Sequence, residues 1–243
     1  MTTVPQIFVV HGALGSAAQM EPIARALESL GNVHNNVHNN VHNFELPGHG
    51  DAMLPDAREF SIATFSNALA AAVDRARDKS TSRPIVFGYS MGGYTALSLE
   101  SKHPGTFAGI LTLGTKFAWN PAVALREGSR LDAGIIAEKV PKYASVLEER
   151  HRNSGGWKLL LERTANLLVQ LGDSPILTRE SLSHVVARTC VAVGERDDTV
   201  SADEAREYAA FVTNSRFEIL PDVPHPIERV PAAAIVAMMA ALI

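Results

Sequence analysis

Residues 88–92 read Gly-Tyr-Ser-Met-Gly, and this pentapeptide places a serine hydroxyl in a pattern that can do covalent chemistry. An apolar run precedes it, and a stretch that can form a helix follows it. In the order strand, G-x-S-x-G turn and helix, the serine is strained and its hydroxyl projects above the sheet. The N–H of Met91 and the partial positive charge of the helix start face the same space. Ser90 in this setting can attack a carbonyl carbon, and the oxyanion that forms meets N–H donors.

Three other apolar runs end in residues that would complete such a site. The first leads into His-Gly-Ala-Leu-Gly-Ser, where the N–H of Ala13 would be a second oxyanion donor. A later run ends in Gly-Glu-Arg-Asp, with Asp197 as its last residue, and another leads to a loop that contains His225. A nucleophile, an acid and a base therefore follow one another along the chain as Ser90, Asp197 and His225.

These motifs and their order resemble the α/β-hydrolase superfamily, and the resemblance covers nearly the whole chain. It implies that Ser90 is the nucleophile and that His225 acts as general base and then as general acid. It also implies that Asp197 holds the imidazole in the correct tautomer and stabilises its cation. Oxyanion N–H groups would come from Ala13 and Met91.

Other carboxylates and imidazoles lie near these positions. Asp198 is adjacent to Asp197, but the spacing Gly-x-x-Asp after the strand is that of the family and favours Asp197. Asp222 is nearer to the catalytic histidine in the sequence, yet it lies on the same loop and would face the imidazole poorly. His11 and His49 also lie in family motifs, where such histidines more often orient loops than react.

The site needs strands that end at one edge of a sheet. Continuous apolar runs between helical stretches predict an α/β fold with a mostly parallel sheet of about six strands and helices on both faces. The strand at 41–46 is expected at a sheet edge, because the chain has no room for the hairpin with which the family usually begins. The predicted strands lie near 6–10, 41–46, 84–88, 109–114, 189–194 and 216–220, and the predicted helices near 17–30, 61–78, 91–102, 202–212 and 231–242.

A chain of 243 residues can bury one large core. We therefore expect residues 1–243 to be a single domain, with a core of 1–116 and 188–243 and a helical cap inserted at about 117–187. Helical spacing places cap helices at 125–139, 140–150 and 157–171. In the family the cap selects the substrate. The predicted substrate-binding residues are Leu14, Phe117, Trp119 and Trp157, with Leu160 and Leu168 as further candidates, although an aromatic or leucine stripe more often packs the cap itself.

Composition sets the expected surroundings. A net charge of −4 and a pI of 6.1 give no electrostatic reason to expect nucleic acid or an anionic membrane as a partner. Cys190 is the only cysteine, so no intrachain disulfide can form, and it is predicted to lie in a buried strand. No secretory signal is visible at the start. The longest apolar run, 232–243, is well short of the ~20 residues of a membrane span. We expect a cytoplasmic protein.

Residues 32–43 contain the tetrapeptide Asn-Val-His-Asn three times in succession. One copy would join the preceding helix to the strand, so two copies look added. The three histidines suggest metal binding, but at this spacing they share a face only in a helix, which Asn and Val disfavour. We expect a loop or strand extension and no metal. The protein would be a monomer or a homodimer, with a strand swap through 32–43 as the alternative.

The sequence predicts a serine hydrolase that acts on a small to medium carboxylic ester through an acyl-enzyme, without a cofactor. We expect few charged residues in the lining of the pocket. Strongly anionic substrates are disfavoured, because no motif supplies an Arg or Lys clamp. Hydrolysis of a lactone, a thioester or a C–C bond, and perhydrolysis, use the same residues and stay open. A non-catalytic small-ligand receptor on this fold is the alternative of a different class, since receptors can retain a triad.

Overall fold

One parallel sheet forms the centre of the protein. The computed structural model describes residues 5–31, 40–53, 55–57, 59–77 and 82–243. Within these residues, six strands are hydrogen-bonded in the order β2-β1-β3-β4-β5-β6, and each pair is parallel. This confirms the predicted α/β fold. The strands are β1 (Ile7–Val10), β2 (Val41–Phe44), β3 (Ile85–Tyr89), β4 (Gly109–Leu113), β5 (Arg188–Arg196) and β6 (Ser215–Pro224).

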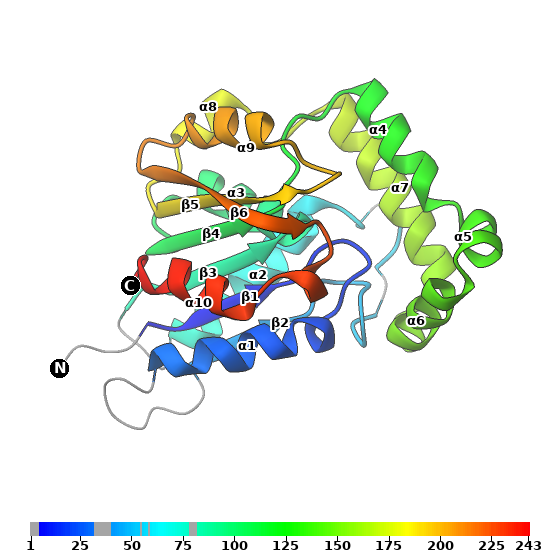
Figure 1. The fold of residues 1–243 in the computed structure, drawn as a ribbon, viewed down its shortest axis with the longest axis horizontal. Helices are drawn as coiled ribbons and strands as arrows, with labels where there is room; N and C mark the ends of the chain where they lie inside the picture. Colours follow the sequence, from blue (N-terminus) through cyan, green and yellow to red (C-terminus); the bar gives the residue numbers. More distant parts are fainter. Residues whose placement is uncertain (1–4, 32–39, 54, 58, 78–81) are drawn as a thin grey trace.

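Helices cover both faces of the sheet because successive strand residues point to opposite sides. On β1, Phe8 and Val10 join a buried cluster with α2 (Ile62–Arg77), α3 (Met91–Lys102) and α9 (Ala202–Ala209). Ile7 and Val9 join a second cluster with α1 (Ala17–Gly31) and α10 (Ala232–Ala240). Figure 1 shows α1 and α10 side by side along one face. Two apolar layers therefore hold the strands in place.

The strand β2 forms one edge of the sheet, as predicted. It begins at Val41, and the buried Asn40 before it accepts the backbone N–H of Ile7 through its carbonyl at 2.7 Å. The side chain of His42 stacks on Phe8, with ring centroids 4.7 Å apart, and its Nε2 lies 2.6 Å from Gln6 Oε1. Residues 32–39 of the repeat, and with them the proposed strand swap, lie outside the described residues.

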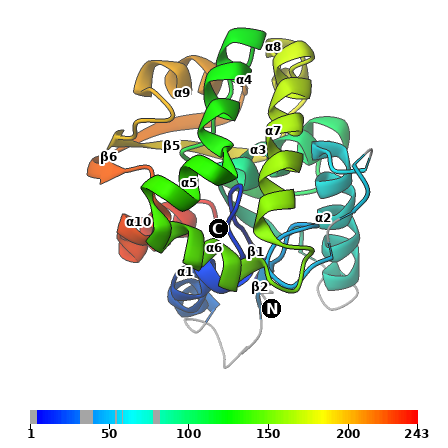
Figure 2. The same cartoon turned by 90° about the vertical axis from the view of Figure 1, so that its right-hand side faces the viewer.

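Four helices between β4 and β5 stand beyond the carboxyl ends of the strands, to the right in Figure 1 and toward the viewer in Figure 2. They are α4 (Pro121–Gly128), α5 (Ala133–Lys139), α6 (Pro141–His151) and α7 (Trp157–Asp173). The sequence predicted one helix over 125–139, but the structure has two. Asp132 separates them, because its carboxylate accepts the N–H of Ile135 at 2.7 Å and caps a new helix.

The last helix of the insertion lies apart from these four. Helix α8 (Arg179–Ser183) packs on α3 and buries Leu182 in the sheet's own core. We use the term cap for α4–α7 from here on. Among the described residues, no helix is long and apolar enough to cross a membrane.

Candidate active site

The turn between β3 and α3 holds Ser90 in a strained conformation. Its φ of 50° and ψ of −116° lie where a residue with a Cβ rarely falls, which costs on the order of 1–3 kcal/mol. Backbone bonds hold the residue there: its N–H donates to Leu113 O at 2.9 Å, and its carbonyl accepts from Gly93 N at 3.0 Å. A Cβ on Gly88 would lie 2.5 Å from the Cα of Gly93, so the turn closes only with glycine at that position.

The ends of β5 and β6 bring an acid and an imidazole together. His225 Nδ1 lies 2.7 Å from Asp197 Oδ2, and the other carboxylate oxygen accepts the N–H groups of Thr199 and Val200, each at 2.9 Å. The Asp197 side chain is 2% exposed and that of His225 is 18% exposed. A carboxylate fixed by two backbone donors holds the proton of the imidazole on Nδ1, which leaves Nε2 free to accept a proton.

The two competing carboxylates point elsewhere. Asp198 is exposed to solvent, and Asp222 forms an ion pair with Arg196 at 2.6 Å on the surface. Asp222 also has a φ of 58° and lies where the pairing of β6 with β5 is irregular, between Leu220 and Pro224. Of the three neighbouring aspartates, Asp197 is the one whose carboxylate meets the imidazole.

Two residues that the sequence analysis did not single out support the acid–imidazole pair. The hydroxyl of Tyr89 donates to the carbonyl oxygen of His225 at 2.8 Å, and burial raises the pKa of that phenol far above its ordinary value. Gly114 lies directly behind the pair, since a Cβ there would be 3.0 Å from Asp197 Oδ2 and 3.1 Å from His225 Cε1. Gly114 directly follows a predicted strand, as Ser90 and Asp197 do, and this position is the sequence signal that could have identified it.

The predicted oxyanion donors Ala13 and Met91 lie on the wall of the pocket that contains Ser90 and His225. Met91 is the first residue of α3, where backbone N–H groups have no partner within the helix. The peptide group that joins Gly12 to Ala13 is held through its oxygen, which contacts His11 Nδ1 at 2.8 Å and accepts from Gly15 N at 3.1 Å. In the described part of the chain, no hydrogen bond joins the hydroxyl of Ser90 to His225; such bonds often close only with substrate bound.

The pocket has a volume of about 450 Å³, and its lining comes from the strand ends and from the cap. Of the predicted pocket residues, Leu14, Trp119 and Leu168 line it. The structure places Phe117 and Trp157 off its wall. Phe117 is 1% exposed and stacks on Tyr208, and Trp157 is 4% exposed with its indole N–H donating to Glu148 at 2.6 Å. Phe117 packs against α9 and Trp157 packs within the cap, and the buried Leu160 belongs to the same cluster.

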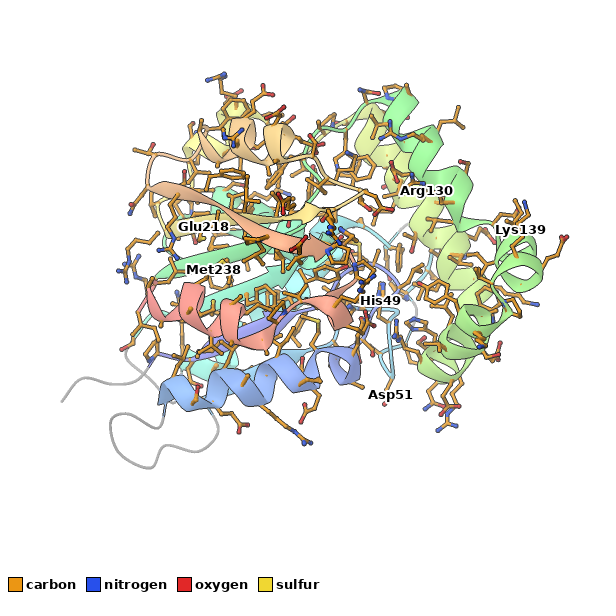
Figure 3. The ribbon with its side chains drawn as sticks, viewed as in Figure 1. His49, Asp51, Arg130, Lys139, Glu218 and Met238 are labelled. Atoms are coloured by element: carbon orange, nitrogen blue, oxygen red, sulfur yellow. The ribbon has the colours of Figure 1, made fainter. Side chains whose placement is uncertain are left out.

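The lining is more charged than the sequence predicted. Side chains of both signs reach the pocket. Most of these charges are paired: Lys116 with Glu204 at 3.0 Å, and Arg130 with Glu127 at 3.1 Å. Figure 3 labels Arg130 on the cap. The expectation that the lining holds few charges was wrong, because these residues lie on elements that no motif marks. The charged residues are Lys116, Glu127, Arg130, Arg150 and Glu228.

Three histidines pack together behind the loop that carries Ala13. The ring of His49 lies 5.1 Å from that of His11 and 5.9 Å from that of His151. Figure 3 labels His49 between the sheet and the cap. Burial, reinforced by His11, lowers the pKa of His49 well below its ordinary value, so the ring is neutral. Among the described residues, no group of three or more His, Cys, Asp or Glu side chains is arranged to hold a metal ion.

Comparison with known proteins agrees with the fold. The chain matches the alpha/beta hydrolase family over residues 7–238. It is a member of that family.

Individual proteins share part of the sequence or the fold with this chain. The chain is 42% identical over 60 residues to the pimeloyl-[acyl-carrier protein] methyl ester esterase of Neisseria meningitidis, a match that spans 25% of this chain and 20% of the relative. The fold is shared with a thermophilic esterase from Thermogutta terrifontis (TM-score 0.70, 20% identity, 99% of this chain and 91% of the other). It is also shared with MenH from S. aureus (0.73, 19%, 100% and 94%) and the enol-lactonase from Burkholderia xenovorans LB400 (0.73, 18%, 99% and 91%).

Proposed function

We propose that this α/β-hydrolase is a serine esterase that cleaves small to medium carboxylic esters through an acyl-enzyme. One observation carries the proposal: a buried aspartate fixes the imidazole of His225 on the wall of the pocket that also contains the strained Ser90. A pocket of about 450 Å³ is within the range of small-ligand sites. The relative from Neisseria is named for a methyl ester, which belongs to the same class of bond.

The chemistry follows from the positions of these groups. The hydroxyl oxygen of Ser90 attacks the ester carbonyl carbon while Nε2 of His225 takes the hydroxyl proton. The N–H groups of Ala13 and Met91 stabilise the oxyanion of the tetrahedral intermediate. The intermediate collapses, the C–O bond to the alcohol breaks, and the imidazole gives the proton to the leaving oxygen.

Water then attacks the acyl-enzyme, and the same steps of attack and collapse take place. The imidazole of His225 takes a proton from the water that attacks the acyl carbon, and it returns that proton to Ser90 as the acid is released. In each half of the reaction the imidazole becomes a cation beside Asp197. The carboxylate stabilises this cation, and it does so from a side chain that is 2% exposed.

A panel of p-nitrophenyl esters of increasing acyl length tests the proposal. Ser90→Ala should lower kcat by several orders of magnitude, because it removes the nucleophile and leaves the fold intact. The matched control is Ser183→Ala, at an exposed serine of α8. A fluorophosphonate should label the wild-type protein at Ser90. Saturable ester binding with no turnover would instead favour a receptor, and labelling at another residue would refute the assignment.

Lactone and thioester substrates belong in the same panel. A kcat/KM for one of them far above that of every ester would assign the pocket to that bond and keep the mechanism. The cytoplasmic setting and the monomer or homodimer stay predictions from the sequence.

A further inference from the structure

The end of cap helix α6 contacts the loop that carries Ala13. His151 Nε2 lies 3.0 Å from the carbonyl oxygen of Leu14, and Arg150 donates to the same oxygen through Nη1 at 2.8 Å. Leu14 is the residue directly after Ala13. Two side chains from the cap therefore meet on one backbone atom of the oxyanion loop, which we define as residues 11–16.

The hydrogen bonds of His151 define its protonation state. The backbone N–H of Gly50 can only donate, and it lies 3.0 Å from Nδ1, so that nitrogen accepts. The carbonyl of Leu14 can only accept, so Nε2 carries the proton and donates it. The side chain is 0% exposed, and burial lowers the pKa of His151 to about 4. The ring is thus a fixed, neutral donor at neutral pH.

The conformation of Leu14 needs such support. Its φ is 59°, in the left-handed region, where a residue with a branched side chain is strained. Strained backbone persists where the surrounding contacts hold it in place. His11 and Gly15 hold the carbonyl of Gly12, and Arg150 and His151 hold that of Leu14. The amide of Ala13 lies between these two fixed carbonyls.

We propose that His151, assisted by Arg150, is a positioning residue for the oxyanion donor. The carbonyl of Gly12 and the N–H of Ala13 belong to one trans peptide group, so the N–H points away from the fixed oxygen. The bonds to Leu14 fix the next turn of the loop. A docked cap would then raise the rate through transition-state stabilisation, in addition to shaping the pocket.

This inference rests on the proposed function, and it can be tested at His151 because that side chain is absent from the pocket wall. Two substitutions distinguish the hydrogen bond that His151 donates to Leu14 from the one that it accepts from Gly50. His151→Gln keeps an N–H donor at about the position of Nε2, whereas His151→Asn keeps only the acceptor toward Gly50. His184, an exposed histidine of the same chain, gives the matched controls His184→Gln and His184→Asn.

We expect His151→Asn to lower kcat about tenfold with KM nearly unchanged, which is the effect of about one lost hydrogen bond in the transition state. His151→Gln should stay within about threefold of the wild type. A trifluoromethyl ketone, which adds Ser90 and mimics the tetrahedral intermediate, should lose affinity in parallel with kcat. The matching carbinol has no carbonyl for Ser90 to attack and forms no oxyanion, so it should bind equally to all variants. The His184 variants should change none of these quantities.

Equal losses for the Asn and Gln variants, or a loss confined to KM, would overturn the inference. If the His151 variants do not fold, the same comparison is made at Arg150, with Arg150→Gln keeping a donor and Arg150→Met removing it. There the inference requires a larger loss of affinity for the ketone than for the carbinol in Arg150→Met. An active Ser90→Ala would overturn the proposed function itself, whereas an inactive Ser90→Ala with an unaffected His151→Asn would overturn this inference alone.

Discussion

Replacing Asp197 by asparagine tests the central pair of the candidate site with a change of one atom. The amide oxygen can still accept the N–H groups of Thr199 and Val200, because both donate to the same oxygen, Oδ1. The amide –NH2 then faces Nδ1 of His225, where the carboxylate oxygen Oδ2 was 2.7 Å away. An amide there favours the tautomer with the proton on Nε2, which cannot accept a proton from Ser90.

The size of the effect follows from the lost attraction. The imidazolium formed during attack and the carboxylate are two unit charges with centres about 4 Å apart, which attract by about 4 kcal/mol at an effective dielectric constant of about 20. The Asp197 side chain is 2% exposed, so solvent screens this attraction little. An energy of about 4 kcal/mol corresponds to about a thousandfold in rate, and the unfavourable tautomer lowers the rate further.

The assay is kcat for a p-nitrophenyl ester of short acyl length, with Asp198→Asn as the matched control and the melting temperature as the test of folding. We expect a loss of at least about a thousandfold for Asp197→Asn and a change of less than about threefold for the exposed Asp198. A loss below tenfold at Asp197 would refute the reasoning. A larger loss at Asp198 than at Asp197 would reverse the assignment.

Three further outcomes follow from the same geometry. Gly114→Ala should lower kcat at least about tenfold, because its Cβ would press on the acid–imidazole pair, whereas Gly105→Ala, also at positive φ but with its nearest neighbour 3.6 Å away, should cost only stability. Trp119→Ala should change the preference among acyl lengths, because Trp119 lines the pocket. Trp157→Ala, at a buried ring, should instead lower the free energy of unfolding by about 3–5 kcal/mol, measured by urea denaturation. Burial lowers the pKa of His151 to about 4. Below about pH 6.5 the unfolded chain therefore binds more protons than the folded chain, and the free energy of unfolding should fall as the pH is lowered from there toward pH 4. In His151→Gln this fall should be shallower.

The residues at the carboxyl edge of the sheet could be predicted from the sequence because each directly follows a strand. Ser90 follows β3, and Asp197 and His225 follow the ends of β5 and β6, so the parallel sheet alone brings these three to one edge. The short spacing from strand to functional residue leaves little freedom for the connecting backbone. The choice of Asp197 over Asp198 depended on that spacing, and the structure pairs Asp197 with the imidazole.

The cap could not be read in the same way, because helical periodicity identifies an apolar face without identifying what that face meets. Phe117 and Trp157 have the residue types of a pocket wall, yet packing within the cap and against α9 buries them. Arg150 and His151 read as ordinary polar residues at a helix end. Their importance depends on contacts to Leu14, 136 and 137 residues away in sequence, which only the folded chain defines.

Arg150 shows why the cap and the core act as one site. Its guanidinium donates to the oxyanion loop at Leu14, and its Nη2 lies 3.9 Å from Glu228, three residues after His225. The carboxylate of Glu228 in turn accepts from Gln19 at 2.6 Å, at the start of α1. The cap therefore touches the loop of the proposed oxyanion donor and the loop of the proposed base through one side chain that is 15% exposed. A change in the cap that moves α6 would act on both loops at once, so substrate selection and catalytic rate should vary together in this protein.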